Sequence, residues 1–348
     1  MWDEPDVVRQ DLERITAATW VPWNELHGST VLVTGASGLI GRPLVKALLW
    51  YGMRHDARIR VLGLTRDLTR SRASFASALG AGAPLTLVEG EVESLKLDGP
   101  VDLIVHGASV TSSHDFVTHP LKTIQTALKG TERVLEVAQD CNASLAYLSS
   151  MEVYGAPDGS RRITESDFDG FNPMLVRNSY PESKRMAEAM CAAYAQELGV
   201  HAKVLRLTQT FGPGVAQDDG RVFASFARSA AKGMDIILQT AGETERSYLY
   251  TADAVTAILT VLLKGQDGQA YNAANEETYC SIRSMADLVA RTCGQAPVAV
   301  RVETEEGTSA YLPTLKMDLD TAKLQALGWK PTVGLEEMYA RMVAVTGL

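Results

Sequence analysis

Four side chains with acid, base or hydroxyl chemistry lie in two short stretches of the chain. Ser150 and Glu152 belong to the run SSMEVYG, and Tyr180 and Lys184 belong to the later run YPESK. A helix places residues four apart on one face. The ammonium of Lys184 would then favour the phenolate of Tyr180 and lower its pKa from about 10, which makes Tyr180 a candidate base. Ser150 is expected to orient a substrate hydroxyl.

The flanking sequence predicts where these two stretches lie. The run SSMEVYG follows the apolar stretch SLAYL, so its polar side chains are expected at the carboxyl end of a buried strand. Open α/β sheets bind ligands at that end of their strands. Pro181 stands at a position favoured in the first turn of a helix, so a helix is predicted over 181–198. The catalytic candidates should therefore meet at one edge of a sheet.

A glycine-rich loop after the first predicted strand indicates a dinucleotide site. The strand VLVT leads into Gly35-Ala-Ser-Gly38-Leu-Ile-Gly41 and a predicted helix at 39–51. The glycines allow a tight turn and close approach of the backbone to a pyrophosphate, and the helix N-terminus supplies amide donors. The predicted cofactor-binding residues are Gly35, Ser37, Gly38, Leu39, Ile40, Gly41, Arg42, Thr65, Arg66, Glu91, Val92, Gly107, Ala108, Ser109, Tyr180 and Lys184.

The end of the second predicted strand bears on the choice between NAD and NADP. A carboxylate there accepts hydrogen bonds from the ribose hydroxyls of NAD and repels a 2′-phosphate. The sequence places Thr65 at that position, followed by Arg66, and Arg42 follows the last glycine of the loop. Two cations without the carboxylate favour NADP, with NAD as the alternative. Arg66 could instead cap a surface turn.

Short apolar runs alternate with helical stretches from residue 29 to residue 207, which predicts a doubly wound parallel α/β sheet of the Rossmann type. Residues 1–28 form an N-terminal extension with a short amphipathic helix. Residues 208–348 are expected to form mainly a smaller α/β substrate-binding lobe, from which a strand near 268–274 returns to the sheet. Helices are also predicted at 121–138, 221–232 and 334–343, and a short strand at 236–239.

Composition excludes several classes of protein. The 348 residues carry 33 Lys and Arg against 42 Asp and Glu, a net charge of −9 with no basic block, which argues against nucleic acid and anionic membranes as partners. No apolar run reaches the roughly 18 residues of a membrane span, so a cytoplasmic location is expected. Four separated cysteines and six scattered histidines predict neither a disulfide framework nor a metal site.

Taken together, these motifs resemble the extended short-chain dehydrogenase/reductase superfamily and its NAD-dependent epimerase/dehydratase family. The likeness runs from about residue 29 through HGAS, YPESKRMAE, DDGRVFASF and ERSYLYTADAV. It is greatest to the UDP-glucuronate decarboxylase and nucleotide-sugar 4,6-dehydratase types. The resemblance implies a nucleotide-diphosphate sugar as substrate and a homodimer. It also implies substrate contacts from Ser109, Met151, Gln209, Arg221 and Arg246.

Glu152 is the residue that separates the reactions within this resemblance. Simple 4-epimerases usually have a small or hydroxyl residue there, whereas dehydratases and decarboxylases have a Glu that moves a proton at C5 of the sugar. The expected activity is therefore a redox-neutral reaction through a transient 4-ketone, with Tyr180 as base and Glu152 as second acid or base. The alternatives are a 4-epimerase, an NADPH-consuming 4-ketoreductase and a non-catalytic dinucleotide-binding regulator.

Four departures from the family pattern predict a diverged sugar pocket. Met151 replaces the Asp of many dehydratases and the Ser of decarboxylases, and it could face a less polar sugar or fill a gap in the core. Ala127 replaces a helix Asn. The run RLTQTFGP has Leu and Gln in place of Pro and Asn, and the run SVTSSHDF lacks the Pro and Tyr that decarboxylases present to the sugar carboxylate.

Overall fold

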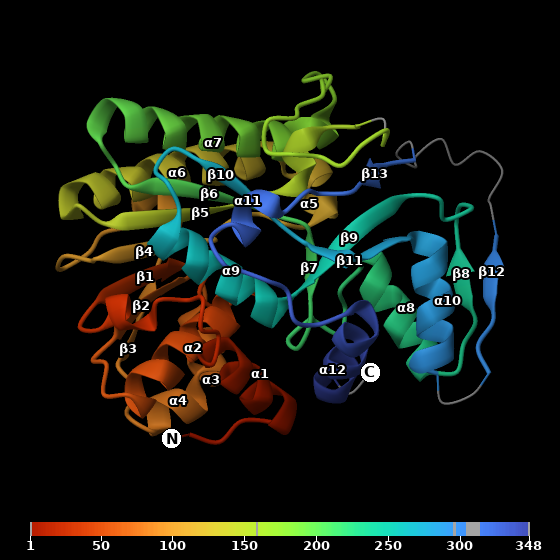
Figure 1. Cartoon of the computed structure of the whole chain (residues 1–348), viewed down its shortest axis with the longest axis horizontal. Coiled ribbons are helices and arrows are strands. Elements are labelled where there is room, and N and C mark those ends of the chain that lie inside the picture. The colour runs from red at the N-terminus through yellow and green to blue at the C-terminus, as the bar shows by residue number, and fades with distance from the viewer. Residues whose placement is uncertain (1, 158, 295–296, 304–313, 347–348) are drawn as a thin grey trace.

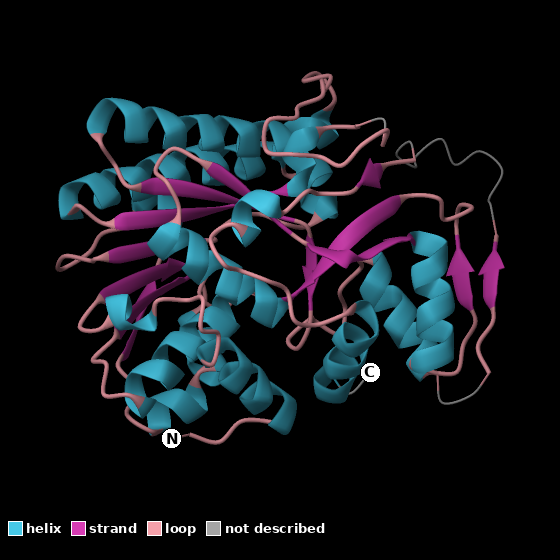
Figure 2. Ribbon diagram, viewed as in Figure 1, coloured by secondary structure: helices cyan, strands magenta, loops and turns pink. Residues whose placement is uncertain are grey.

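The computed structural model describes residues 2–157, 159–294, 297–303 and 314–346. Within them, seven strands form a parallel sheet in the order β10-β6-β5-β4-β1-β2-β3, between layers of helices (Figure 1 and Figure 2). The order reverses between β1 and β4, as doubly wound sheets require. The predicted fold class and the returning strand are confirmed. The strands are β1 Thr30–Thr34, β2 Arg60–Thr65, β3 Leu85–Glu89, β4 Leu103–His106, β5 Ser144–Ser150, β6 Ala202–Leu207 and β10 Ala270–Ala273.

Each face of the sheet buries its own apolar cluster. Alternate side chains of β1 point to opposite faces, so Val31 and Val33 join one cluster and Leu32 joins the other. The helices α6 and α7 lie side by side over the Leu32 face, and α2 and α9 cover the opposite face. The bounds of these helices are α2 Gly41–Arg54, α6 Pro120–Cys141, α7 Ser179–Leu198 and α9 Thr251–Lys264. Shorter helices connect them, namely η1 Trp23–Leu26, α3 Leu68–Ser74, α4 Ala76–Gly80, η2 Val92–Ser94, α5 Ser113–Thr118, η3 Met151–Tyr154 and η4 Val176–Asn178.

The position of α9 differs from the sequence expectation, which counted it with the smaller lobe. The structure packs α9 against β4, β5 and β6 of the main sheet. Its residues from Thr251 to Leu262 are all buried, because both the sheet and the lobe cover it. A helix that is apolar on every side needs partners on every side.

The smaller lobe contains two short sheets flanked by helices. One sheet pairs β9 with β7, β11 and β13, and the other pairs β8 with β12. The predicted helices at 221–232 and 334–343 and the predicted strand at 236–239 are present as α8, α12 and β8. None of the helices in the described part of the chain is long and apolar enough to cross a membrane. The elements are β7 Gln209–Phe211, α8 Val222–Ala231, β8 Ile236–Leu238, β9 Glu245–Tyr250, β11 Asn275–Ser281, α10 Ile282–Thr292, β12 Val300–Val302, β13 Lys316–Met317, α11 Ala322–Gln325 and α12 Leu335–Thr346.

The N-terminal helix α1 (Asp6–Thr16) ties the main sheet to the smaller lobe, since it packs against α2, α9 and α12. The buried carboxylate of Asp11 lies at the centre of this contact. It accepts hydrogen bonds from the Tyr250 hydroxyl at 2.6 Å and from Arg341 Nη1 at 3.1 Å. Burial raises the pKa of Asp11 to about 6, although Tyr250 and Arg341 oppose the rise.

We expect Asp11→Ala to lower the free energy of unfolding by about 2 kcal/mol, because Tyr250 and Arg341 lose a buried partner. A folded-state pKa above the unfolded one means that protonation of Asp11 favours the folded protein. The loss should therefore be larger at pH 5 than at pH 7.5. Urea unfolding at both pH values measures it. Arg9→Ala, which breaks the exposed pair with Asp6, is the control. Equal losses of unfolding free energy in Asp11→Ala and Arg9→Ala would contradict a stabilising role for the buried contact of Asp11.

Candidate active site

The catalytic candidates meet where β5 ends and α7 begins. Ser150 closes β5, and its hydroxyl accepts a hydrogen bond from the backbone N–H of Glu152 at 3.2 Å, which caps η3. Ser150 lies close enough to the Tyr180 hydroxyl to affect its pKa. Lys184 donates from Nζ to the carbonyl oxygen of Leu148 at 2.7 Å, so helix and strand are joined. The structure thus brings Ser150, Glu152, Tyr180 and Lys184 together.

Tyr180 lies in a more apolar setting than the sequence indicated. Its ring stacks on Phe116 of α5 at 4.2 Å with an angle of 8° between the planes. Burial raises the pKa of Tyr180, and the charge of Glu152 adds to the rise, while the hydrogen bond from Ser150 opposes it. The predicted lowering of this pKa by Lys184 is wrong, because desolvation by burial outweighs the effects that lower it.

The ammonium group of Lys184 lies closer to the ring of Tyr147 than to the ring of Tyr180. Its Nζ lies 4.7 Å from the centre of the Tyr147 ring and 5.9 Å from the centre of the Tyr180 ring. Burial lowers the pKa of Lys184 to about 8, against the opposing charge of Glu188. Most of the lysine therefore remains an ammonium at neutral pH.

Glu152 is paired with an arginine that the sequence analysis did not select. Both terminal nitrogens of Arg177 donate to Glu152 Oε2, at 3.2 and 3.3 Å. Arg177 belongs to η4, immediately before α7, so the pair joins the two catalytic stretches. The sequence places Arg177 three residues before Tyr180, which was the signal available for selecting it. Its pairing with Glu152 is visible only in the folded structure.

The glycine-rich loop has the geometry that close backbone packing requires. The N–H of Gly38 donates to the carbonyl oxygen of Gly35 at 3.0 Å. A Cβ at Gly41 would lie 2.2 Å from that oxygen, and a Cβ at Gly35 would lie 3.0 Å from the backbone of the β4 loop at Gly107. The helix α2 begins at Gly41, two residues later than predicted, because residues 38–40 complete the turn. These contacts fit a dinucleotide held against the loop.

The loops that follow β1 and β4 are joined by Thr34. Its hydroxyl oxygen accepts hydrogen bonds from the N–H groups of Gly107 and Ala108, each at 3.1 Å. Ser109 follows, and its hydroxyl donates to the carbonyl oxygen of Val110 at 3.2 Å. The predicted cofactor residues of the β4 loop therefore lie beside the glycine-rich loop, at the point where the strand order reverses.

The end of β2 gathers positive charge. Thr65 is buried, and its hydroxyl contacts Ser71 at 2.6 Å. Burial and the nearby cation of Arg70 lower the pKa of Arg42. The Nε of Arg42 is buried without a hydrogen-bond partner among the described residues. Arg66 is exposed. Arg70, one turn into α3, is a candidate that the sequence analysis missed.

The two cofactor candidates after β3 have different surroundings. Val92 is buried and packs against α6 at Gly130, where a Cβ would lie 2.6 Å from Val92 Cγ1. Glu91 is exposed and lies 4.0 Å from Lys122 Nζ. Of these two residues, Val92 packs into the protein interior and Glu91 lies at the surface.

The predicted substrate residues are spread over the loop after β4, η3, β7, β9 and the residue that precedes α8. Met151 is buried in a cluster with Val153 and Leu319, and its sulfur accepts a hydrogen bond from Thr208 at 3.3 Å. Gln209 opens β7, which pairs with β9, the strand that carries Arg246. The Nε of Arg246 is buried with no hydrogen-bond partner in the described ranges.

Arg221 differs from Arg246 because its guanidinium is already engaged. It donates to the carboxylate of Asp219, with Nε to Oδ1 at 2.9 Å and Nη2 to Oδ2 at 2.5 Å. Its side chain is 38% exposed. A diphosphate would have to share this arginine with Asp219, whereas Arg246 Nε has no competing acceptor in the part of the chain that the structure describes.

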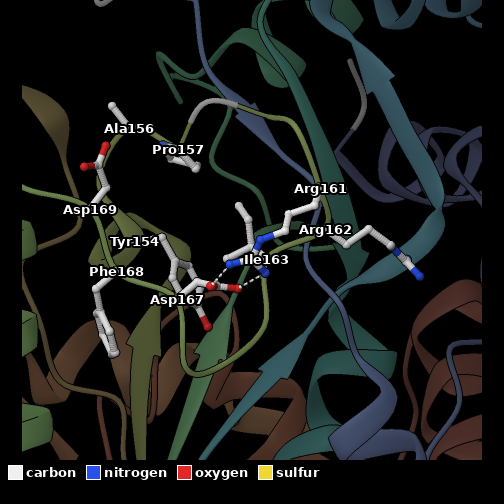
Figure 3. Close-up of a pocket in the computed structure, with 9 residues that line it drawn as sticks. All are labelled: Tyr154, Ala156, Pro157, Arg161, Arg162, Ile163, Asp167, Phe168 and Asp169. Atoms are coloured by element: carbon white, nitrogen blue, oxygen red, sulfur yellow. Dashed lines mark hydrogen bonds and ion pairs between the residues drawn. The ribbon is translucent and has the colours of Figure 1, made fainter.

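A separate cavity of about 280 Å³ opens beside η3 (Figure 3). Its lining includes none of the predicted catalytic or cofactor residues. The cations at its wall are paired within the protein, Arg161 with Asp167 and Arg162 with Glu276. No cluster of three metal-ligating side chains occurs among the described residues. The cavity is lined by Tyr154, Ala156, Pro157, Arg161, Arg162, Ile163, Asp167, Phe168 and Asp169.

A doubly wound sheet with a glycine-rich turn after β1 and a Ser, Tyr and Lys set at its carboxyl edge defines a dinucleotide-dependent enzyme of the short-chain dehydrogenase/reductase type. The family model of the NAD dependent epimerase/dehydratase family matches residues 31–274. The chain belongs to this family, and it is an NAD(P)-dependent enzyme.

Three relatives illustrate the similarity. UDP-glucuronic acid decarboxylase 1 of Xenopus tropicalis is 30% identical over 332 residues, which cover 94% of this chain and 75% of the relative. UDP-glucuronic acid decarboxylase 6 of Arabidopsis thaliana is 30% identical over 307 residues, covering 88% and 85%. The solved dTDP-glucose 4,6-dehydratase of Streptomyces venezuelae, with NAD bound, is 26% identical with a TM-score of 0.74, covering 90% of this chain and 95% of that one.

We expect Gly41→Ala to weaken dinucleotide binding at least about tenfold, because a methyl group 2.2 Å from the Gly35 oxygen forces the loop apart. Titration of the purified protein with NAD+ and NADP+ measures the affinity. Gly80→Ala in α4 is the control, since a Cβ there meets nothing within 4 Å. Unchanged affinity in Gly41→Ala would show that the loop does not hold the dinucleotide.

Proposed function

We propose that this enzyme modifies a nucleotide-activated sugar without net oxidation or reduction, through a transient 4-ketone. The observation that carries the proposal is Glu152, which lies beside the Ser150, Tyr180 and Lys184 set. An enzyme that only oxidised or reduced C4 would need no carboxylate at this place. The relatives named as UDP-glucuronic acid decarboxylases and as a dTDP-glucose 4,6-dehydratase support the nucleotide-sugar class.

Tyr180 takes the proton of the C4 hydroxyl, and Ser150, which lies beside Tyr180, accepts or donates a hydrogen bond to that hydroxyl and so orients it. Bound NAD(P)+ supplies the hydride acceptor. Lys184 stabilises the phenolate as it forms, since its ammonium is held in place by the Leu148 carbonyl. The raised pKa of Tyr180 means that the base must be activated when substrate and cofactor fill the site.

Glu152 acts after the ketone has formed. A 4-ketone acidifies the hydrogen on C5 and also activates a carboxyl group on C5 for loss. In dehydration, Glu152 takes the C5 proton, the C–H electron pair moves into the enolate, and the C6 hydroxyl then leaves as water with that proton, after which the hydride taken from C4 returns to C6. In decarboxylation, the C5–C6 electron pair moves into the enolate as CO2 leaves, protonated Glu152 gives a proton to C5, and the hydride returns to C4. The decarboxylase relatives favour the second course.

We also propose NADP as the preferred cofactor. Arg42 and Arg70 lie close enough for their charges to repel, and Arg42 Nε has a donor without a partner among the described residues. A 2′-phosphate between them would relieve the repulsion and accept that hydrogen bond. Thr65, at the end of β2, provides no opposing carboxylate.

The first test is incubation of the enzyme with UDP-glucuronic acid and with dTDP-glucose, followed by mass analysis of the products. Loss of CO2 or of water supports the proposal. An unchanged mass with altered chromatography indicates a 4-epimerase instead, and turnover only with added NADPH indicates a 4-ketoreductase.

We expect Glu152→Gln to stop at the ketone and to accumulate reduced nicotinamide, seen by absorbance. Full activity of Glu152→Gln would contradict the role of the carboxylate.

The cofactor preference is tested by Arg42→Gln. This variant should lose about tenfold more affinity for NADP+ than for NAD+, because only NADP+ carries the 2′-phosphate. Isothermal titration of the cofactor-free protein measures both affinities. Arg72→Gln, exposed on the same α3 helix as Arg70, should leave both unchanged. Equal losses for the two dinucleotides would assign Arg42 to the shared part of the cofactor.

A further inference from the structure

Arg177 occupies a position between the two catalytic elements. Its guanidinium reaches from η4 to Glu152 in η3, with Nη1 and Nη2 both directed at the single oxygen Oε2. The side chains of Arg177 and Glu152 are 30% and 29% exposed, so the pair is only partly in water. An ion pair in such a setting is screened less than one on the surface.

The two residues that follow Arg177 are tied to other parts of the fold by side-chain hydrogen bonds. The next residue but one, Ser179, donates from its hydroxyl to the carbonyl oxygen of Phe116 at 3.1 Å. Asn178 donates from Nδ2 to the carbonyl oxygen of Asn172 at 2.9 Å. The helix η4 also packs against α5 and α7. Arg177 therefore projects from a rigid base, as a residue that must hold another side chain does.

The charge on Glu152 already acts on the reacting centre, since it raises the pKa of Tyr180. The guanidinium of Arg177, paired with that carboxylate, moderates its field and fixes its direction. The elements packed against η3 bring other charged or titratable groups near it. They are Tyr180, Lys184 and Arg185 on α7 and Asp169 in the preceding loop, where Arg185 Nε donates to the Val153 carbonyl and the Asp169 N–H donates to the Tyr154 carbonyl.

Within the described residues, none of these groups makes a hydrogen bond to the Glu152 side chain, whereas Arg177 does. We propose that Arg177 is a positioning residue that fixes the orientation of the Glu152 carboxylate. It acts through Glu152 and takes no proton itself, because a guanidinium stays protonated. The inference rests on the proposed function, in which Glu152 exchanges a proton with C5.

The contact has a consequence for the second half of the reaction. Removal of the C4 hydrogen does not use Glu152, whereas proton exchange at C5 does. Replacement of Arg177 should therefore slow the steps after the ketone has formed, so that reduced nicotinamide accumulates during turnover.

The experiment follows nicotinamide absorbance and product formation in the wild type and four variants, with UDP-glucuronic acid as substrate and with dTDP-glucose if only that sugar reacts. Glu152→Gln gives the signature of a lost carboxylate, which is accumulation of reduced nicotinamide. We expect Arg177→Gln to show the same signature with kcat lowered about tenfold, and Arg177→Lys to restore most of the rate. Arg14→Gln, which breaks the part-exposed pair with Glu337, should change nothing.

Dinucleotide affinity, measured on the same preparations, should be unchanged in Arg177→Gln. An unchanged affinity would show that the variant is folded. A fall in kcat in Arg177→Gln without accumulation of reduced nicotinamide, or without rescue by Arg177→Lys, would give Arg177 a structural role only and overturn the inference. Failure of the wild-type enzyme to convert either sugar would overturn the proposed function and this inference with it.

Discussion

The hydrogen bond from Lys184 to the Leu148 carbonyl is the contact on which the rest of the site depends. A buried ammonium must have an acceptor, and the carbonyl of a strand that ends two residues later is one that cannot move. One helical turn before Lys184 stands Tyr180, and two residues after Leu148 stands Ser150. The bond therefore fixes the distance between the base and the hydroxyl that orients the substrate.

Much of this arrangement could be predicted because its signals are local. The glycine-rich turn, the apolar runs of β1, β4 and β5 and the spacing of Tyr180 and Lys184 each lie within a few residues of one another. They predicted the parallel sheet, the returning strand β10 and the meeting of β5 with α7. Hydrophobic period and turn chemistry are read from neighbouring residues, so a single sequence carries them.

The features that the sequence did not predict depend on long-range contacts or on burial. Phe116 covers Tyr180, and Arg177 holds Glu152, although these partners are far apart along the chain. Burial reverses the expected pKa shift of Tyr180. The sequence assigned α9 to the smaller lobe, whereas the structure packs it against the main sheet. Such outcomes follow from packing, which a linear pattern does not specify.

The central claim is that one hydride leaves C4 of a nucleotide sugar and returns to the same molecule. UDP-glucuronic acid with deuterium at C4 tests it directly, with the mass of the product as readout. A product that retains the deuterium, formed without added NADPH, is the result this account predicts. A product that has lost the deuterium, or that forms only when NADPH is supplied, would contradict it.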